Sequence, residues 1–240
     1  MLKILHVTDL HSHKPFYKWV AEQSNQYDVI CISGDLIGYT KHQIDDDTVF
    51  EQQQFVIQWL EAMIKPVFVC SGNHDVINSE ESDLNFNLDD FDSGIDDTDN
   101  WEVNEEPVSA ERCMWLNNFN NKNIYADNSI ITIEGVTFGV VPYNYSGDMS
   151  QFKQCDILVH HEPPAKTNTA IQNGSDWGSE ELYQALKTHV ISPRFVLSGH
   201  VHHPNNKIST INRTTIYNPG ADFSQNIPKN KVLLYENIFG

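Results

Sequence analysis

Short apolar runs alternate with amphipathic segments through the first 70 residues of this chain. The expected buried strands of this half are residues 4–7, 29–33 and 67–70. Residues 14–24 carry apolar side chains at helical spacing, and residues 48–64 do so over a longer stretch. Thr48 and Glu51 are placed as a capping box at the start of the second helix, and Pro66 ends it. This alternation predicts an α/β domain.

The second half of the chain is richer in strands. Residues 130–133 and 136–141 flank Glu134-Gly135 and predict a hairpin. A helix is expected over residues 179–190, where Leu182, Leu186 and Val190 are four apart. The remaining expected strands are residues 157–159, 195–197, 208–211, 214–217 and 232–235. We expect the last three of these to complete a second sheet.

Residues 76–106 break the pattern with an acidic, Asn-rich stretch. Residues 80–106 contain twelve acids and no Lys or Arg, so they carry −12 of the net charge of −18. We interpret the stretch as a solvated surface insertion in a single domain of residues 1–240. The alternative is a lid, or a flap that binds a protein partner. A short helix is expected to follow over residues 109–119.

Composition and charge indicate where the protein is located and which partners it does not bind. No apolar run approaches the roughly 20 residues that span a bilayer, and the N-terminus lacks the features of a signal peptide. These features predict a cytoplasmic protein. The acidic field repels nucleic acid and anionic membranes. The chain has only three arginines, which argues further against a nuclease that grips a duplex.

Five polar motifs stand at the ends of predicted strands. They are Asp9-Leu10-His11, Gly34-Asp35, Gly72-Asn73-His74-Asp75, His160-His161-Glu162-Pro163 and Gly199-His200-Val201-His202. Functional groups of α/β sheets collect outside the carboxyl ends of strands. The motifs supply two carboxylates, one amide and several imidazoles, a set that suits two divalent metal ions sharing one carboxylate. Because no motif contains a cysteine, the set argues against a structural zinc site.

Local spacing indicates how these side chains can share metals. In an extended segment residues i and i+2 point to the same side, so Asp9 and His11 can reach one metal. His200 and His202 either do the same or diverge to two metals at a turn.

Glycine precedes two of the candidate oxygen ligands. Gly34 lets the chain bend so that Asp35 can sit between both metals, and Gly72 is expected to give the same freedom before Asn73. Oxygen and imidazole ligands suit Mn, Fe, Zn, Ni or Co better than calcium, and the pattern does not choose among them.

In this order the motifs resemble the calcineurin-like metallophosphoesterase superfamily, over the span from Asp9 to Gly220. The resemblance implies an α/β fold with four αββα layers, in which two mixed β-sheets face each other. It implies the following ligands: Asp9, His11 and His202 for the first metal, Asp35 as the bridge, and Asn73, His200 and a histidine of the His160-His161 pair for the second. It places His74 outside the coordination shell, beside the scissile bond.

The choice between the paired histidines follows from the same resemblance. The family pattern places the ligand two residues before the first proline of a Pro-Pro pair. Pro163 and Pro164 therefore select His161, with His160 as the alternative.

The chemistry that these features predict is hydrolysis of a small phosphate ester. Protein Ser/Thr phosphatases of the superfamily follow Gly-Asp with Asp-Arg-Gly, whose arginine holds a phosphate, whereas Asp35 here runs into Leu36-Ile37-Gly38. A monoester dianion gains more from arginine than a diester does, so the departure favours a phosphodiesterase over a phosphatase. The alternative from another class is a non-catalytic interaction scaffold on the same fold.

Overall fold

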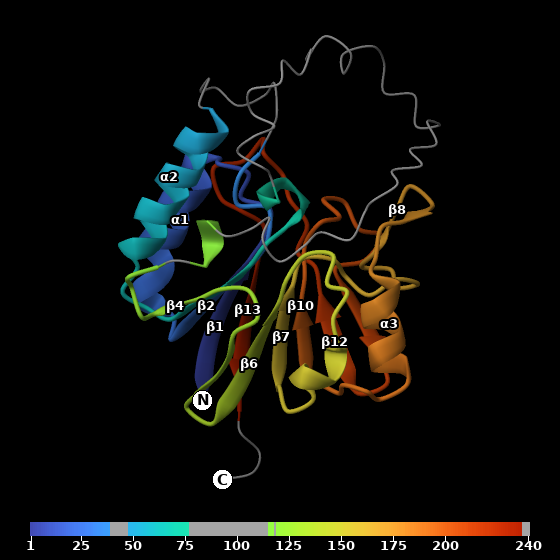
Figure 1. The fold of residues 1–240 in the computed structure, drawn as a ribbon. Helices are drawn as coiled ribbons and strands as arrows, with labels where there is room; N and C mark the ends of the chain where they lie inside the picture. Colours follow the sequence, from blue (N-terminus) through green and yellow to red (C-terminus); the bar gives the residue numbers. More distant parts are fainter. Residues whose placement is uncertain (39–47, 77–114, 118, 237–240) are drawn as a thin grey trace.

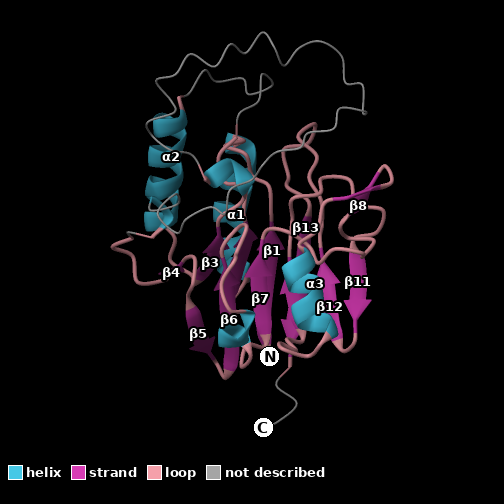
Figure 2. Ribbon diagram, turned by 45° about the vertical axis from the view of Figure 1, so that its right-hand side comes forward, coloured by secondary structure: helices cyan, strands magenta, loops and turns pink. Residues whose placement is uncertain are grey.

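The structure is a computed structural model of the chain, and it describes residues 1–38, 48–76, 115–117 and 119–236. Two β-sheets face each other between helices (Figure 1). Helices α1 (Lys14–Gln23) and α2 (Val49–Glu61) cover the outer face of one sheet, and α3 (Glu180–Lys187) covers the outer face of the other (Figure 2). The expected α/β sandwich with two mixed sheets is confirmed.

The first sheet has five strands in the order β13-β1-β2-β3-β4. Their bounds are β1 (Leu2–Val7), β2 (Val29–Ser33), β3 (Val67–Cys70), β4 (Ile124–Tyr125) and β13 (Asn230–Tyr235). Strands β1 to β4 are parallel, and β13 pairs antiparallel with β1, with Leu2 opposite Tyr235. The expectation that the last strand completes the second sheet was therefore wrong. Its side chains Leu233 and Tyr235 therefore enter the core between the sheets from the first sheet, and not from the second.

The second sheet has six strands in the order β11-β12-β10-β7-β6-β5. Their bounds are β5 (Ile130–Ile133), β6 (Val136–Val141), β7 (Ile157–His160), β10 (Phe195–Leu197), β11 (Ile208–Ile211) and β12 (Thr214–Tyr217). The predicted β5–β6 hairpin is confirmed, with Glu134 and Gly135 both at positive φ, as a tight right-twisted turn requires. A small hairpin of β8 (Ile171–Gln172) and β9 (Ser175–Asp176) was not predicted.

Three apolar clusters fill the three spaces between the four layers. Leu5 of β1 packs toward α1 and α2, whereas Ile4 packs into the core between the sheets. On β7, Ile157 faces that central core and Leu158 faces α3. Because successive side chains of a strand point to opposite faces, continuous apolar strands such as these are buried on both sides.

The helices predicted over residues 14–24, 48–64 and 179–190 form, with shorter ends than expected. Thr48 Oγ1 accepts a hydrogen bond from Glu51 N at 3.2 Å, and a Glu51 carboxylate oxygen accepts one from Thr48 N at 2.8 Å, so the capping box is confirmed. Helix α2 ends at Glu61. Pro66 disfavours helical geometry at the residue before it, so the helix could not have continued through Lys65. Helix α3 begins after Ser179, whose hydroxyl accepts from Leu182 N at 3.1 Å.

The topology gathers the carboxyl ends of the central strands at one edge of the sandwich. Strands β1, β2 and β3 run parallel in the first sheet, and β6, β7 and β10 run parallel in the second. The polar motifs follow these ends, at the upper edge of the two sheets in Figure 1. The expected acidic insertion, apart from Val76, and most of the expected helix over residues 109–119 lie outside the described residues. In the part of the chain that the structure describes, no helix is both long and apolar enough to cross a membrane.

Candidate metal centre

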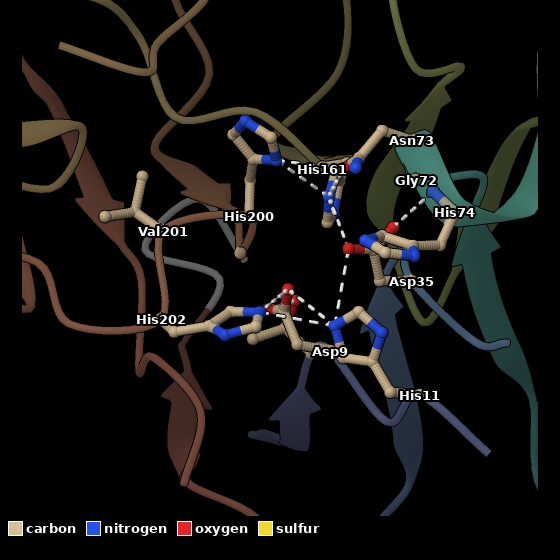
Figure 3. A network of polar contacts seen from close by, with 12 residues as sticks. Asp9, His11, Asp35, Gly72, Asn73, His74, His161, His200, Val201 and His202 are labelled. Atoms are coloured by element: carbon tan, nitrogen blue, oxygen red, sulfur yellow. Dashed lines mark hydrogen bonds and ion pairs between the residues drawn. The ribbon is translucent and has the colours of Figure 1, made fainter. Parts of the chain in front are cut away.

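The strand ends bring together all seven side chains that were predicted to bind metal. Figure 3 shows them as two groups with Asp35 between them. One group consists of Asp9, His11 and His202, and the other of Asn73, His161 and His200. Each group takes side chains from both sheets, so the site spans the seam between the sheets.

The first group is tightly clustered. The Nε2 atoms of His11 and His202 lie 3.2 Å apart, and Asp9 Oδ1 lies 3.3 Å from His202 Nε2. One ligand atom from each of these residues and from Asp35 lies within 4.8 Å of all the others. Asp9, His11 and Asp35 are buried, whereas the His202 side chain is 34% exposed. The group therefore opens to solvent on the His202 side.

The second group has the same compactness. Asn73 Oδ1 lies 3.0 Å from His161 Nε2 and 3.0 Å from His200 Nδ1, and these two nitrogens are 3.2 Å apart. His200 and His202 thus diverge to different groups, which was one of the two arrangements that the sequence left open. The divergence follows from the backbone, because His200 has a φ of 65°.

Asp35 joins the two groups. Its Oδ2 lies 3.5 Å from His11 Nε2 and 3.3 Å from His161 Nε2. Its Oδ1 accepts a hydrogen bond from the backbone N–H of His74 at 3.0 Å. The His74 ring is half-buried and lies edge-on to His11, with ring centroids 4.7 Å apart. His74 is thereby held at the edge of the first group.

The backbone at the ligand positions is strained. Asp9, His11 and Asp35 have φ values of 53°, 42° and 52°, in the left-handed region that non-glycine residues seldom occupy. Each such residue costs about 1–3 kcal/mol. Asp9 and His11 therefore converge through left-handed turns beyond the end of β1, and the extended geometry that the sequence suggested was wrong.

Two glycines leave room for ligands of neighbouring strands. A Cβ on Gly72 would lie 2.2 Å from Asp35 Oδ1, and one on Gly199 would lie 2.5 Å from Asp9 Oδ2. Gly72 has ordinary backbone angles, φ −116° and ψ −178°. The expectation that Gly72 supplies backbone freedom was wrong, because its function is to let Asp35 approach closely.

Hydrogen bonds behind the site orient its candidate ligands. His161 Nδ1 donates to the carbonyl of Ser33 at 2.8 Å, which leaves Nε2 turned toward Asn73. The Thr8 hydroxyl lies 2.6 Å from Asp9 Oδ2 and 2.8 Å from the same Ser33 carbonyl. His160 points elsewhere, since its Nδ1 bonds the carbonyl of Val141 at 3.2 Å. Of the paired histidines, His161 is the one that reaches the cluster.

The electrostatics of the site favour bound positive charge. Burial opposes charge on His161, but the Asp35 and Asp9 carboxylates raise its pKa to about 10. Burial opposes charge on Asp35 as well, yet neighbouring His161 holds the Asp35 pKa well below its usual range. Burial lowers the pKa of His11 and of His200 to about 4, so both are neutral and can offer a lone pair to a metal.

Asp75, the last residue of its motif, holds the main chain. Its carboxylate accepts from the backbone N–H groups of Gly72 at 2.8 Å, Leu36 at 3.0 Å and Ile37 at 3.1 Å. These bonds tie the loop that follows β2 to the loop that follows β3. Asp75 thereby fixes the relative position of Asp35 and Asn73.

Two residues that shape the site had no predicted role in it. Asn218 Nδ2 lies within 3.1 Å of the carbonyls of Thr169, Gly199 and Val201, so it fastens the loop that carries His200 and His202. Its place in an Asn-Pro-Gly turn was the available signal. Phe223, whose ring lies beside His202, has no motif that would reveal it.

Three other histidines of the described part lie outside the two ligand groups. His13 is half-buried at the rim, with its ring 4.5 Å from Phe16, and His189 and His203 are exposed. His42 lies outside the described residues. None of these had a predicted ligand role.

Comparison with known proteins identifies the class. A model of the calcineurin-like phosphoesterase family matches residues 2–204. Because that match covers most of the chain, the protein belongs to the calcineurin-like phosphoesterase family. Membership implies a hydrolase of phosphate esters with a metal centre, which the Asp/His cluster at the strand ends fits.

Solved structures agree on the fold. The chain is similar to the protein TT1561 of Thermus thermophilus, with a TM-score of 0.55, 13% identity and coverage of 96% of this chain and 97% of that one. It is also similar to the purple acid phosphatase PPD1 from yellow lupin (Lupinus luteus) seeds, with a TM-score of 0.52 and 15% identity. That match covers 90% of this chain and 43% of the lupin protein. No curated protein matched the sequence.

Proposed function

We propose that the protein is a phosphodiesterase of small esters that uses two divalent metal ions. The observation that carries the proposal is the position of Asp35 Oδ2, 3.5 Å from His11 Nε2 and 3.3 Å from His161 Nε2, between two groups of metal-binding side chains. A carboxylate between two such groups is suitably placed to serve two metals that lie close together.

The residues present fit two metals. The paired imidazole nitrogens in each group lie 3.2 Å apart, and two nitrogen lone pairs do not face each other stably without a shared proton or cation. Asp9, His11, Asp35 and His202 would hold one ion, and Asp35, Asn73, His161 and His200 the other. The mixed oxygen and nitrogen donors suit Mn, Fe, Zn, Ni or Co. Bound there, the ions supply an activated water and polarise the phosphoryl oxygens.

His74 is proposed as the catalytic acid. Its backbone N–H is fixed on Asp35 at 3.0 Å, and its half-buried ring stands at the edge of the cluster rather than within it. From that position the imidazolium can donate a proton to the departing ester oxygen. Loss of such an acid typically lowers the rate about 10²- to 10⁴-fold.

The distribution of arginine supports a diester over a monoester. Arg194 and Arg213 precede β10 and β12, which are parallel, so both lie at the amino ends of strands whose carboxyl ends face the site. The Arg194 guanidinium donates to the carbonyl of Glu236 at 3.0 Å. Arg112 lies outside the described residues. Without a guanidinium from the described part, a monoanionic diester is the better matched substrate.

The test combines metal analysis with two model esters. Wild type loaded with each candidate metal is expected to hold about two ions per chain and to hydrolyse bis-p-nitrophenyl phosphate faster than p-nitrophenyl phosphate. His74→Ala is expected to keep its metals and lose most of the diester activity. His189→Asn, an exposed histidine at a φ of 61° that asparagine tolerates, is the matched control and is expected to behave as wild type.

The outcomes separate the alternatives. Faster hydrolysis of the monoester would move the assignment to a phosphatase. Two bound metals without turnover of either ester would favour the interaction scaffold. Equal rates for His74→Ala and wild type would remove the proposed acid from the mechanism.

A further inference from the structure

Phe223 is an exposed aromatic residue that directly adjoins the first group of candidate ligands. Its ring centroid lies 5.3 Å from that of His11 and 5.5 Å from that of His202, at interplanar angles of 75° and 71°. Phe223 is nevertheless 37% exposed. Among the exposed large apolar residues of the described chain, it is the one whose ring contacts site imidazoles.

The Phe223 ring packs on a buried phenylalanine. It stacks on Phe16 with centroids 5.8 Å apart and planes 28° apart, and Phe16 is 1% exposed. The preceding residues are fixed to the ligand loop, because Ala221 N donates to the carbonyl of His202 at 3.0 Å. Gly220 has a φ of 74°, and a Cβ there would lie 2.4 Å from the same carbonyl oxygen. The segment that carries Phe223 is thus hydrogen-bonded to the loop that carries His202.

Burial distinguishes Phe223 from the phenylalanines that only fill space. Phe68, Phe138 and Phe152 are fully buried, as expected for core packing. A ring that served only to cover the imidazoles would gain most by burying its whole surface. Phe223 instead keeps 37% of its surface exposed, and the neighbouring His202 side chain is 34% exposed. That open surface is available to a ligand of the site.

We propose that Phe223 determines specificity by binding a planar aromatic substituent of the phosphate ester. This inference rests on the proposed function and names the class of substrate. Because the Phe223 ring adjoins His11 and His202, a substituent of a phosphoryl group bound at these side chains would lie close to that ring. Flat rings stack on an aromatic side chain better than small alkyl groups do, because more apolar surface is covered.

The test compares two phosphonates that differ only in the substituent. Phenylphosphonate and methylphosphonate are titrated by calorimetry into the metal-loaded protein. Phe223→Ala is expected to weaken phenylphosphonate about three- to tenfold, the usual range for one aromatic contact, and to leave methylphosphonate unchanged. Phe223→Tyr is expected to retain wild-type affinity for both. Leu234→Ala is the control, because Leu234 is 57% exposed near the opposite end of the sheet, paired with Lys3.

Equal weakening of both phosphonates in Phe223→Ala, or no change in either, would overturn the inference. So would a wild type that does not prefer phenylphosphonate. Metal content and thermal melting of each variant show whether His11 and His202 keep their places. Failure of the proposed function gives a different result, in which no ester is hydrolysed while phenylphosphonate binding still depends on Phe223.

Discussion

Substituting Gly72 by alanine tests whether the site depends on the close approach of two strand ends. The substitution removes no ligand and no hydrogen-bonding group. The backbone angles of Gly72, φ −116° and ψ −178°, are allowed for alanine. The new Cβ would lie 2.2 Å from Asp35 Oδ1 and 2.4 Å from Asp35 N. The whole perturbation therefore falls on Asp35.

The size of the effect follows from these distances. Ordinary contacts between such atoms are about 3.5 Å, so Asp35 or the loop of Gly72 must move by about 1 Å. Overpacking of this kind costs about 1–3 kcal/mol, which lowers the melting temperature by about 2–12 °C in a chain of this size. A displacement of about 1 Å at a catalytic centre lowers the rate about 10²-fold.

The assay measures metal content, kcat/KM for bis-p-nitrophenyl phosphate, and thermal melting. Gly72→Ala is expected to lose metal affinity and about 10²-fold in kcat/KM while it remains folded. Gly174→Asn is the control, because a Cβ at Gly174 meets nothing within 4 Å and asparagine tolerates its φ of 87° better than other residues. A Gly72→Ala protein with two bound metals and kcat/KM within about twofold of wild type would refute this reasoning.

Four further substitutions test other parts of the structure. His161→Asn is expected to lose metal, whereas His160→Asn is expected to keep it, because His160 Nδ1 bonds the carbonyl of Val141 at 3.2 Å; elemental analysis that gave the reverse order would exchange their roles. Thr48→Ala removes the capping box and is expected to cost about 1 kcal/mol in urea unfolding, with metal content unchanged. Burial raises the pKa of Asp127 to about 6, so its folded form holds a proton that the unfolded form releases near pH 4. The free energy of unfolding of wild type, measured in chelator, should fall by about 1–2 kcal/mol relative to that of Asp127→Asn as the pH rises from 4 to 6. If the two proteins showed the same dependence of stability on pH, this prediction would be wrong.

Much of the site was predictable because its residues follow strands. Buried parallel strands are short apolar runs, and their carboxyl ends meet at one edge of the sheet. The position of motifs such as Gly34-Asp35 and Gly199-His200 at that edge can therefore be predicted from the strands that precede them. The capping box of Thr48 and Glu51 was predictable for a similar reason, since it is a contact between neighbours in sequence. Each of these features is local.

Features that depend on distant contacts were not predictable. The segment 232–235 is apolar throughout, so its sequence does not indicate which sheet it joins. Its pairing with β1 places it in the first sheet. The space required at Gly72 is set by Asp35, a residue 37 positions earlier in the chain. Phe223 adjoins His11 although 212 positions separate them, and a single phenylalanine in a loop gives no sign of such a neighbour.

The sequence by itself determined the α/β class, the strand ends and the set of candidate metal-binding side chains, because these follow from local periodicity and from motifs of a few residues. The tertiary structure decided how those side chains divide between two groups. In it His200 and His202 belong to different groups, His161 and not His160 reaches the cluster, and Asp35 lies between the groups. These outcomes depend on backbone turns and on close approaches between two sheets, which no segment encodes alone.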